Sequence, residues 1–157
     1  MCKKMSIPSY MFDTTVFNHI LDHGIDISVF RGKARFYATH VQYDEIKNTE
    51  DPKRREELLE VFNDVIERKV STGSAVWDVS NWDQAKWSDE ENGLYSDIKT
   101  KLDKLNKKKK NNMQDALIAE TAIKNHFVLV TDDKDLREVT KIFGGKCTDS
   151  PTVFRCR

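Results

Sequence analysis

Residues 112–136 read NMQDALIAETAIKNHFVLVTDDKDL and contain a helical pattern, a short turn, an apolar run and a group of acids, in that order. Apolar side chains recur at the helical period between residues 113 and 123. The run 127–130 is unbroken, apolar and rich in β-branched residues, which is typical of a strand buried on both faces of a sheet. Asp115 opens the helix, and Asp132, Asp133 and Asp135 follow the strand. The stretch therefore predicts one helix and one inner strand of an α/β fold, with acids at both ends.

The rest of the chain also alternates strands and helices. We expect strands at residues 9–12, 35–39, 127–130 and 146–147, and helices at 14–24, 41–47, 52–69, 94–105, 113–123 and 136–143. Residues 25–30 fit either a short second helix or a turn. Gly24 is typical of a helix end, and Asp51-Pro52 is typical of a helix start. Such alternation predicts a central parallel sheet with right-handed crossovers, flanked by helices in three layers.

Length and composition narrow the choices further. A chain of 157 residues predicts a single domain, 1–157, with a helical or irregular insertion at about 71–110 that carries Trp77, Trp82 and Trp87. Charged residues make up 33% of the chain but balance to a net charge of zero, so global charge gives no argument for a nucleic acid or a membrane. The apolar runs are too short for a membrane span or a signal peptide, and we expect a cytoplasmic protein.

Neither the cysteines nor the histidines form a zinc pattern. Cys2, Cys147 and Cys156 are widely spaced, and no Cys-x-x-Cys occurs, so we expect them to be reduced. His19 and His23 are four residues apart, but the glutamate of the metalloprotease pattern is absent beside His19.

Four acids are placed where they can converge on one edge of the predicted sheet. Asp13 ends the first strand, Glu45 lies in the helix after the second, Asp115 opens the helix before the 127–130 strand, and Asp133 follows that strand. In open α/β sheets the functional crevice lies beyond the carboxyl ends of the strands. Clustered carboxylates repel one another unless a cation compensates them, and oxygen ligands of this kind suit Mg²⁺ or Mn²⁺. Such a site can activate water against a phosphodiester.

These residues also carry a resemblance to a family. Four segments in chain order, FDTT at 12–15, THVQYDEI at 39–46, DALIA at 115–119 and TDDKDL at 131–136, resemble the four motifs of the PIN-domain ribonucleases, which include the VapC-type toxins of toxin–antitoxin systems. The resemblance implies a PIN-like fold and a metal-dependent endoribonuclease. It makes Asp13, Glu45, Asp115 and Asp133 the catalytic and metal-binding acids; in the Asp132–Asp133 doublet either side chain could be the ligand, and we favour Asp133. It also implies an RNA substrate, an antitoxin partner and a homodimer, although the 71–110 segment is long for the compact toxin-type members.

Several further residues are candidates around this site. Outer-shell candidates are Thr14, Thr131, Asp132 and Asp135, and candidate RNA contacts are Lys107, Lys108, Lys109 and Lys110. The lysines are equally well explained as a solvated helix end. The three tryptophans could stack on bases, but packing of the insertion onto the body is the interpretation we favour.

Each acid, taken singly, has an ordinary explanation as a helix cap, a first-turn acid or a turn residue. Only their joint order favours the metal site. The alternative function is a catalytically inactive PIN-like module that binds RNA or a protein. A receiver-like signalling domain would need a phosphoacceptor aspartate after its third strand and a lysine after its fifth, and we cannot place that pair.

Overall fold

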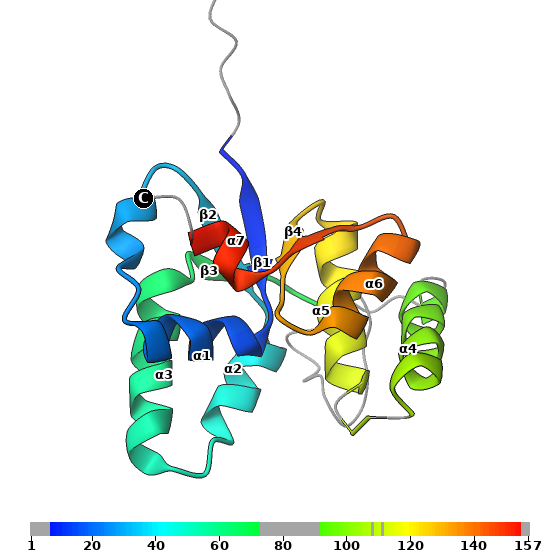
Figure 1. Ribbon diagram of the computed structural model, residues 1–157, viewed down its shortest axis with the longest axis horizontal. Coiled ribbons are helices and arrows are strands. Elements are labelled where there is room, and N and C mark those ends of the chain that lie inside the picture. Colours follow the sequence, from blue (N-terminus) through cyan, green and yellow to red (C-terminus); the bar gives the residue numbers. More distant parts are fainter. Residues whose placement is uncertain (1–6, 73–91, 108, 111, 155–157) are drawn as a thin grey trace, which may run out of the picture.

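A five-stranded parallel sheet forms the centre of the computed structural model, which describes residues 7–72, 92–107, 109–110 and 112–154 (Figure 1). The strand order is β3-β2-β1-β4-β5. The strands are β1 (Ser9–Phe12), β2 (Arg35–Ala38), β3 (Arg68–Lys69), β4 (Val128–Val130) and β5 (Lys146–Thr148). β1 lies between β2 and β4, with Met11 opposite Tyr37 on one side and Leu129 on the other. Every pairing is parallel, as the alternation predicts.

Helices connect these strands and cover both faces of the sheet. They are α1 (Thr14–His23), the 3-10 helix η1 (Ile27–Phe30), α2 (His40–Lys47), α3 (Pro52–Val65), α4 (Asn92–Asn106), α5 (Asn112–Lys124), α6 (Lys134–Ile142) and α7 (Ser150–Phe154). In Figure 1, α1, α3 and α7 lie on one side of the strands, and α4, α5 and α6 lie on the other. The predicted three-layer α/β fold is therefore confirmed.

Successive strand residues face two separate cores, because side chains alternate across a strand. Met11 and Leu129 are fully buried among apolar side chains of α4, α5 and α6. Phe12 and Val130 are fully buried among those of α1 and α3. Complete burial of one such side chain contributes roughly 1.5–3 kcal/mol. The unbroken apolar run at 127–130 is thus an inner strand covered on both faces, as predicted.

The predicted helix ends are confirmed in part. Gly24 ends α1 in the left-handed conformation with φ 57°, and Thr39 caps α2 in a capping box with Gln42. The predicted end of the helix at 52–69 is wrong, because α3 ends at Val65. Beyond it, Glu67 N and Val70 N donate to carbonyl oxygens of β2 residues at 2.9 and 2.8 Å, and these bonds draw residues 68–69 into the sheet as β3.

Two elements near the C-terminal end also differ from the prediction. The helix expected from Leu136 begins at Lys134, because Asp133 caps it, and α7 was not predicted.

Within the expected insertion, α4 packs on α5 and α6 through the buried side chains of Ile98 and Leu102. Trp77, Trp82 and Trp87 lie outside the described residues. None of the helices in the described ranges is long and apolar enough to cross a membrane.

Candidate functional site

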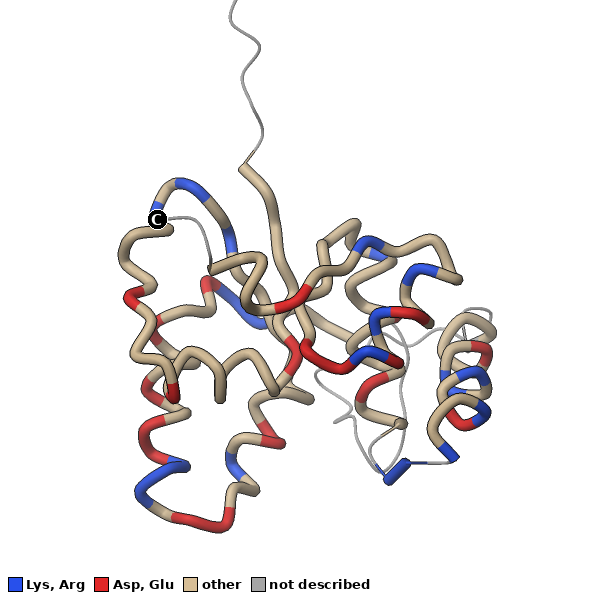
Figure 2. The backbone as a smooth tube through the Cα atoms, in the orientation of Figure 1, with Lys and Arg blue, Asp and Glu red and all other residues tan. Residues whose placement is uncertain are grey.

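The carboxyl ends of β1 and β4 form the centre of the site. The chain passes from β1 to β2 and β3 on one side of the sheet, whereas β4 and β5 lie on the other side of β1. The switch point of this parallel sheet therefore lies between β1 and β4, where open α/β folds bind their ligands. Acidic segments meet there, at the starts of α1 and α6 (Figure 2).

Asp13 is held in place by hydrogen bonds from three groups. It caps α1, and its Oδ1 accepts from the backbone N–H of Thr14 at 2.8 Å. Its Oδ2 accepts from the hydroxyls of Thr131 at 2.7 Å and Thr15 at 3.2 Å. The side chain is only 4% exposed. Burial raises the pKa of Asp13, and these hydrogen bonds oppose the rise while Asp133 adds to it.

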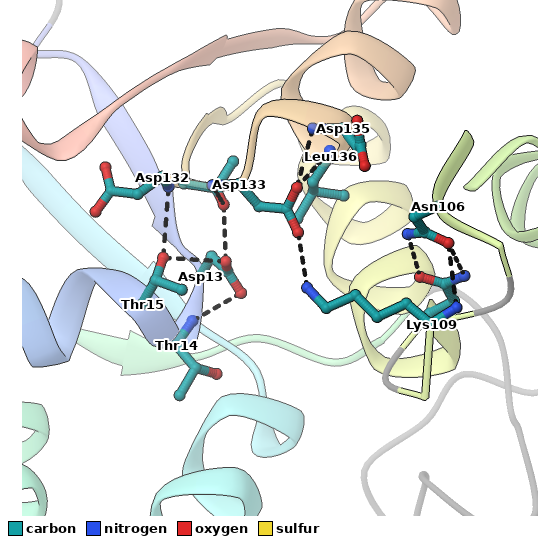
Figure 3. A network of polar contacts seen from close by, with 11 residues as sticks. Asp13, Thr14, Thr15, Asn106, Lys109, Asp132, Asp133, Asp135 and Leu136 are labelled. Atoms are coloured by element: carbon teal, nitrogen blue, oxygen red, sulfur yellow. Dashed lines mark hydrogen bonds and ion pairs between the residues drawn. The ribbon is translucent and has the colours of Figure 1, made fainter. Parts of the chain in front are cut away.

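Asp133 lies beside Asp13 but has different hydrogen-bond partners. It caps α6, and its Oδ1 accepts from the backbone N–H groups of Asp135 and Leu136 at 2.9 and 3.3 Å. Its Oδ2 accepts from Lys109 Nζ at 3.1 Å (Figure 3). Burial would raise the pKa of Asp133, but the bond from Lys109 and the helix N–H groups outweigh it, and the pKa is lowered.

The two members of the Asp132–Asp133 doublet point in different directions (Figure 3). Asp132 turns toward α7, where its carboxylate accepts from Ser150 N and Ser150 Oγ, both at 2.8 Å. Asp133 faces Lys109 and the other acids. Of the outer-shell candidates, Thr131 and Thr14 contact Asp13, whereas Asp135 reaches the site through its backbone N–H to Asp133.

Glu45 and Asp115 complete the acidic cluster. Burial raises the pKa of Glu45 to about 7, and the negative charge of Asp13 adds to the effect. Burial also raises the pKa of Asp115 to about 8, with contributions from Asp13 and Glu45. Asp115 is 4% exposed, and Glu45 Oε1 is buried with no hydrogen-bond partner among the described residues. Asp13 and Asp115 thus each interact electrostatically with the other three predicted acids.

The donor chemistry of this cluster fits a hard divalent cation, since all four candidate ligands are carboxylates and oxygen ligands suit such a cation. Burial is the main cause of the raised pKa values of Asp13, Glu45 and Asp115, and repulsion between the acids adds to it; a bound cation would relieve both effects. As the side chains stand, no three His, Cys, Asp or Glu side chains in the described ranges are close enough together to hold a metal ion. Within the part of the chain that the structure describes, the cation that contacts the cluster is the ammonium of Lys109.

Two features of the site were not predicted. Of the predicted lysine run, Lys109 forms an ion pair with Asp133. Lys107 and Lys110 are exposed, and Lys108 lies outside the described residues. The place of that run directly before the helix that carries Asp115 was the available signal. Thr15 was not among the predicted site residues, yet its hydroxyl donates to Asp13 Oδ2 and accepts from Asp132 N at 3.4 Å.

Comparison with known proteins supports the fold. No protein-family model and no curated protein matches the chain. Among solved structures, a chain of VapBC2 from Rickettsia felis, bound to a DNA fragment from its promoter, is 15% identical with a TM-score of 0.57; the match covers 90% of this chain and 98% of that one.

Two further structures are similar. VapBC-5 from Mycobacterium tuberculosis, a member of the VapBC family of toxin–antitoxin systems, is 16% identical with a TM-score of 0.48, over 90% of this chain and 96% of that one. FitAcB from Neisseria gonorrhoeae is 12% identical with a TM-score of 0.45, over 90% and 97%. The likeness to the R. felis chain confirms the predicted PIN-like α/β fold.

Proposed function

We propose that this chain, with its PIN-like fold, is a metal-dependent endoribonuclease that hydrolyses RNA phosphodiester bonds. The observation that carries the proposal is the convergence of Asp13, Glu45, Asp115 and Asp133 at the switch point of the sheet. Among the described residues one ion pair, that of Lys109 with Asp133, is formed with these four carboxylates, and buried carboxylates without a cation lower the stability of the fold. Such a cluster is therefore expected where the acids bind a ligand.

The four acids would hold Mg²⁺ or Mn²⁺, which would supply an activated water and stabilise the leaving oxygen of the phosphodiester. Residues of the chain prepare the ligands for this role. Thr131 fixes the Asp13 carboxylate and the Asp133 backbone at once, since its Oγ1 donates to Asp13 Oδ2 at 2.7 Å and accepts from Asp133 N at 3.1 Å. Thr131 therefore restricts the freedom of Asp13 and of the Asp133 backbone before the cation binds, which lowers the entropic cost of ordering these two ligands.

Lys107 and Lys110 have exposed side chains on the α4–α5 connection, which also carries Lys109, and they would contact RNA phosphates together with Lys108. We also propose that the chain acts as the toxin of a toxin–antitoxin pair in the cytoplasm, with an antitoxin over the acidic site and a homodimer as the assembled form. The R. felis neighbour, whose fold this chain shares, is a VapBC complex.

The test is a map of new RNA 5′ ends in cells after brief expression of the chain. We expect discrete cleavage sites with the wild type and none with Asp13→Asn, which keeps a capping side chain on α1 but removes the charge. Identical maps for the two proteins would contradict the proposed function, provided that both accumulate to the same level.

A catalytically inactive module that binds RNA or a protein is the second candidate. The observation that favours it is the ion pair of Lys109 with Asp133, which gives one of the acids a partner without a metal. Such a module would bind RNA equally well with and without Mn²⁺ and would leave it uncut.

A further inference from the structure

Lys109 reaches the acidic cluster from a different part of the chain than the acids themselves. It lies on the connection between α4 and α5, and its Nζ contacts Asp133 Oδ2 at 3.1 Å. Its own pKa is raised: burial opposes the rise, but the hydrogen bond to Asp133 and the charges of Asp133, Asp115 and Asp13 outweigh it. Lys109 in turn lowers the pKa of Glu45, so the ammonium interacts with all four acids.

The connection that carries Lys109 is held by a network of amides (Figure 3). Asn106 and Asn112 exchange two hydrogen bonds, both 2.9 Å long, and Asn112 Nδ2 also donates to Asp103 Oδ1 at 2.7 Å. Asn106 Oδ1 accepts from the backbone N–H of Lys109 at 3.2 Å, and the Lys109 carbonyl accepts from Asn112 N at 3.2 Å. Asn112 is 2% exposed. The backbone of Lys109 is therefore fixed on both sides, and its side chain is directed at the acids.

We propose that Lys109 is an internal countercation of the acidic site, which a divalent metal must displace from Asp133 in order to bind. The proposal rests on the proposed function for the metal itself. An ammonium and a divalent cation repel each other strongly at contact distance, so both cannot occupy Asp133 Oδ2 together. Lys109 then neutralises part of the acid cluster in the metal-free protein and weakens metal binding.

This role predicts that loss of Lys109 changes two quantities in opposite directions: the stability of the metal-free protein falls and its affinity for the metal rises. Loss of the ammonium removes an ion pair from the metal-free protein, so its stability falls slightly. The same loss removes the competitor, so metal affinity rises. A lysine that only binds RNA phosphate would change neither quantity, and an ordinary surface ion pair would change at most the first.

The experiment titrates Mn²⁺ into the full chain by calorimetry. It compares the wild type with Lys109→Met, which keeps the length of the side chain, with Lys109→Arg, which keeps the charge, and with Lys104→Met, an exposed control on α4. We expect Lys109→Met to bind Mn²⁺ roughly threefold more tightly or better, because loss of a single weak ion pair frees Asp133 for the metal. Lys109→Arg and Lys104→Met should resemble the wild type. In EDTA, Lys109→Met should melt a few degrees lower.

The outcomes separate the two proposals. Binding of Mn²⁺ by Lys109→Met alone would support the inference in its strongest form. Equal or weaker binding by Lys109→Met than by the wild type would overturn the countercation and leave the metal site intact. If neither protein binds Mn²⁺, the metal site fails, and the inference fails with it. Circular dichroism of each variant shows whether it is folded.

Discussion

At the scale of single residues, two of the four acids serve the fold as well as the site. Asp13 and Asp133 cap α1 and α6, so the ordinary explanation of each is correct. The cap also fixes the carboxylate, because one oxygen of each accepts from helix N–H groups; the other accepts from Thr131 and Thr15 in Asp13 and from Lys109 in Asp133. Asp115 differs, since it is buried in the first turn of α5 beside other acids. It is therefore the residue at which the cost of the cluster is most easily measured.

Replacement of Asp115 by asparagine should stabilise the metal-free protein at high pH. The folded pKa of Asp115, about 8, is above its unfolded value of 3.8, so the folded protein holds more protons between these values. Its stability consequently falls as pH rises through that range. At about pH 8 in EDTA we expect Asp115→Asn to be more stable than the wild type by about 1–3 kcal/mol, with a Tm several degrees higher.

The difference should shrink toward zero near pH 4, where the carboxyl is protonated and resembles the amide. Thermal unfolding at a series of pH values measures it. Asp97→Asn, an exposed change on α4, is the matched control and should follow the wild type at every pH. A variant that is less stable than the wild type at pH 8 would show that Asp115 is not an uncompensated buried charge.

The positions of the acids could be predicted from the sequence, but their directions could not. Strand ends and motif order place Asp13, Glu45, Asp115 and Asp133 at one edge of the sheet. The choice between Asp132 and Asp133 depends on Ser150, eighteen residues later, which takes the carboxylate of Asp132. No local pattern contains that contact.

At the scale of elements, Thr131 joins the two βα units that supply Asp13 and Asp133. It is fully buried, and its one hydroxyl donates to Asp13 and accepts from the Asp133 backbone. Thr131→Val keeps the shape but removes both bonds, so we expect a loss of about 1–3 kcal/mol in the free energy of unfolding. We also expect RNA cleavage at least tenfold slower, because Asp13 and Asp133 lose their common anchor.

Thr131→Ser is the matched variant, since it restores the hydroxyl and loses only a methyl group. Urea unfolding and initial cleavage rates measure the two effects. The hydrogen bonds of the Thr131 hydroxyl have no functional role if Thr131→Val cleaves RNA at the rate of Thr131→Ser.

The elements that were not predicted, β3 and α7, are short and lack an apolar pattern of their own. β3 consists of two exposed charged residues, Arg68 and Lys69, and exists because the edge of β2 offers it backbone partners. α7 is five residues long and begins at Ser150, which Asp132 holds from a distance. Strands and helices with long apolar patterns, such as β4 and α5, were predicted within a residue or two.

At the scale of the whole molecule, function depends on the order of the strands. β1 lies at the centre, and the reversal between β1 and β4 creates the edge on which the acids meet. The sequence predicts parallel strands but not which strand neighbours which, because the crossovers that decide it are long-range. The placement of α4 against α5 and α6 is equally non-local, yet it brings Lys109 to the acids.

The most direct test of the central claim is cleavage of one labelled single-stranded RNA by the purified chain, followed through three additions: buffer with EDTA, then excess Mn²⁺, then EDTA again. We expect no cleavage, cleavage, and its arrest, in that order. Asp115→Asn should show no cleavage throughout while remaining folded, and Asp97→Asn should behave as the wild type. Cleavage that is indifferent to Mn²⁺ and EDTA, or that persists at the wild-type rate in Asp115→Asn, would contradict a metal-dependent acidic site.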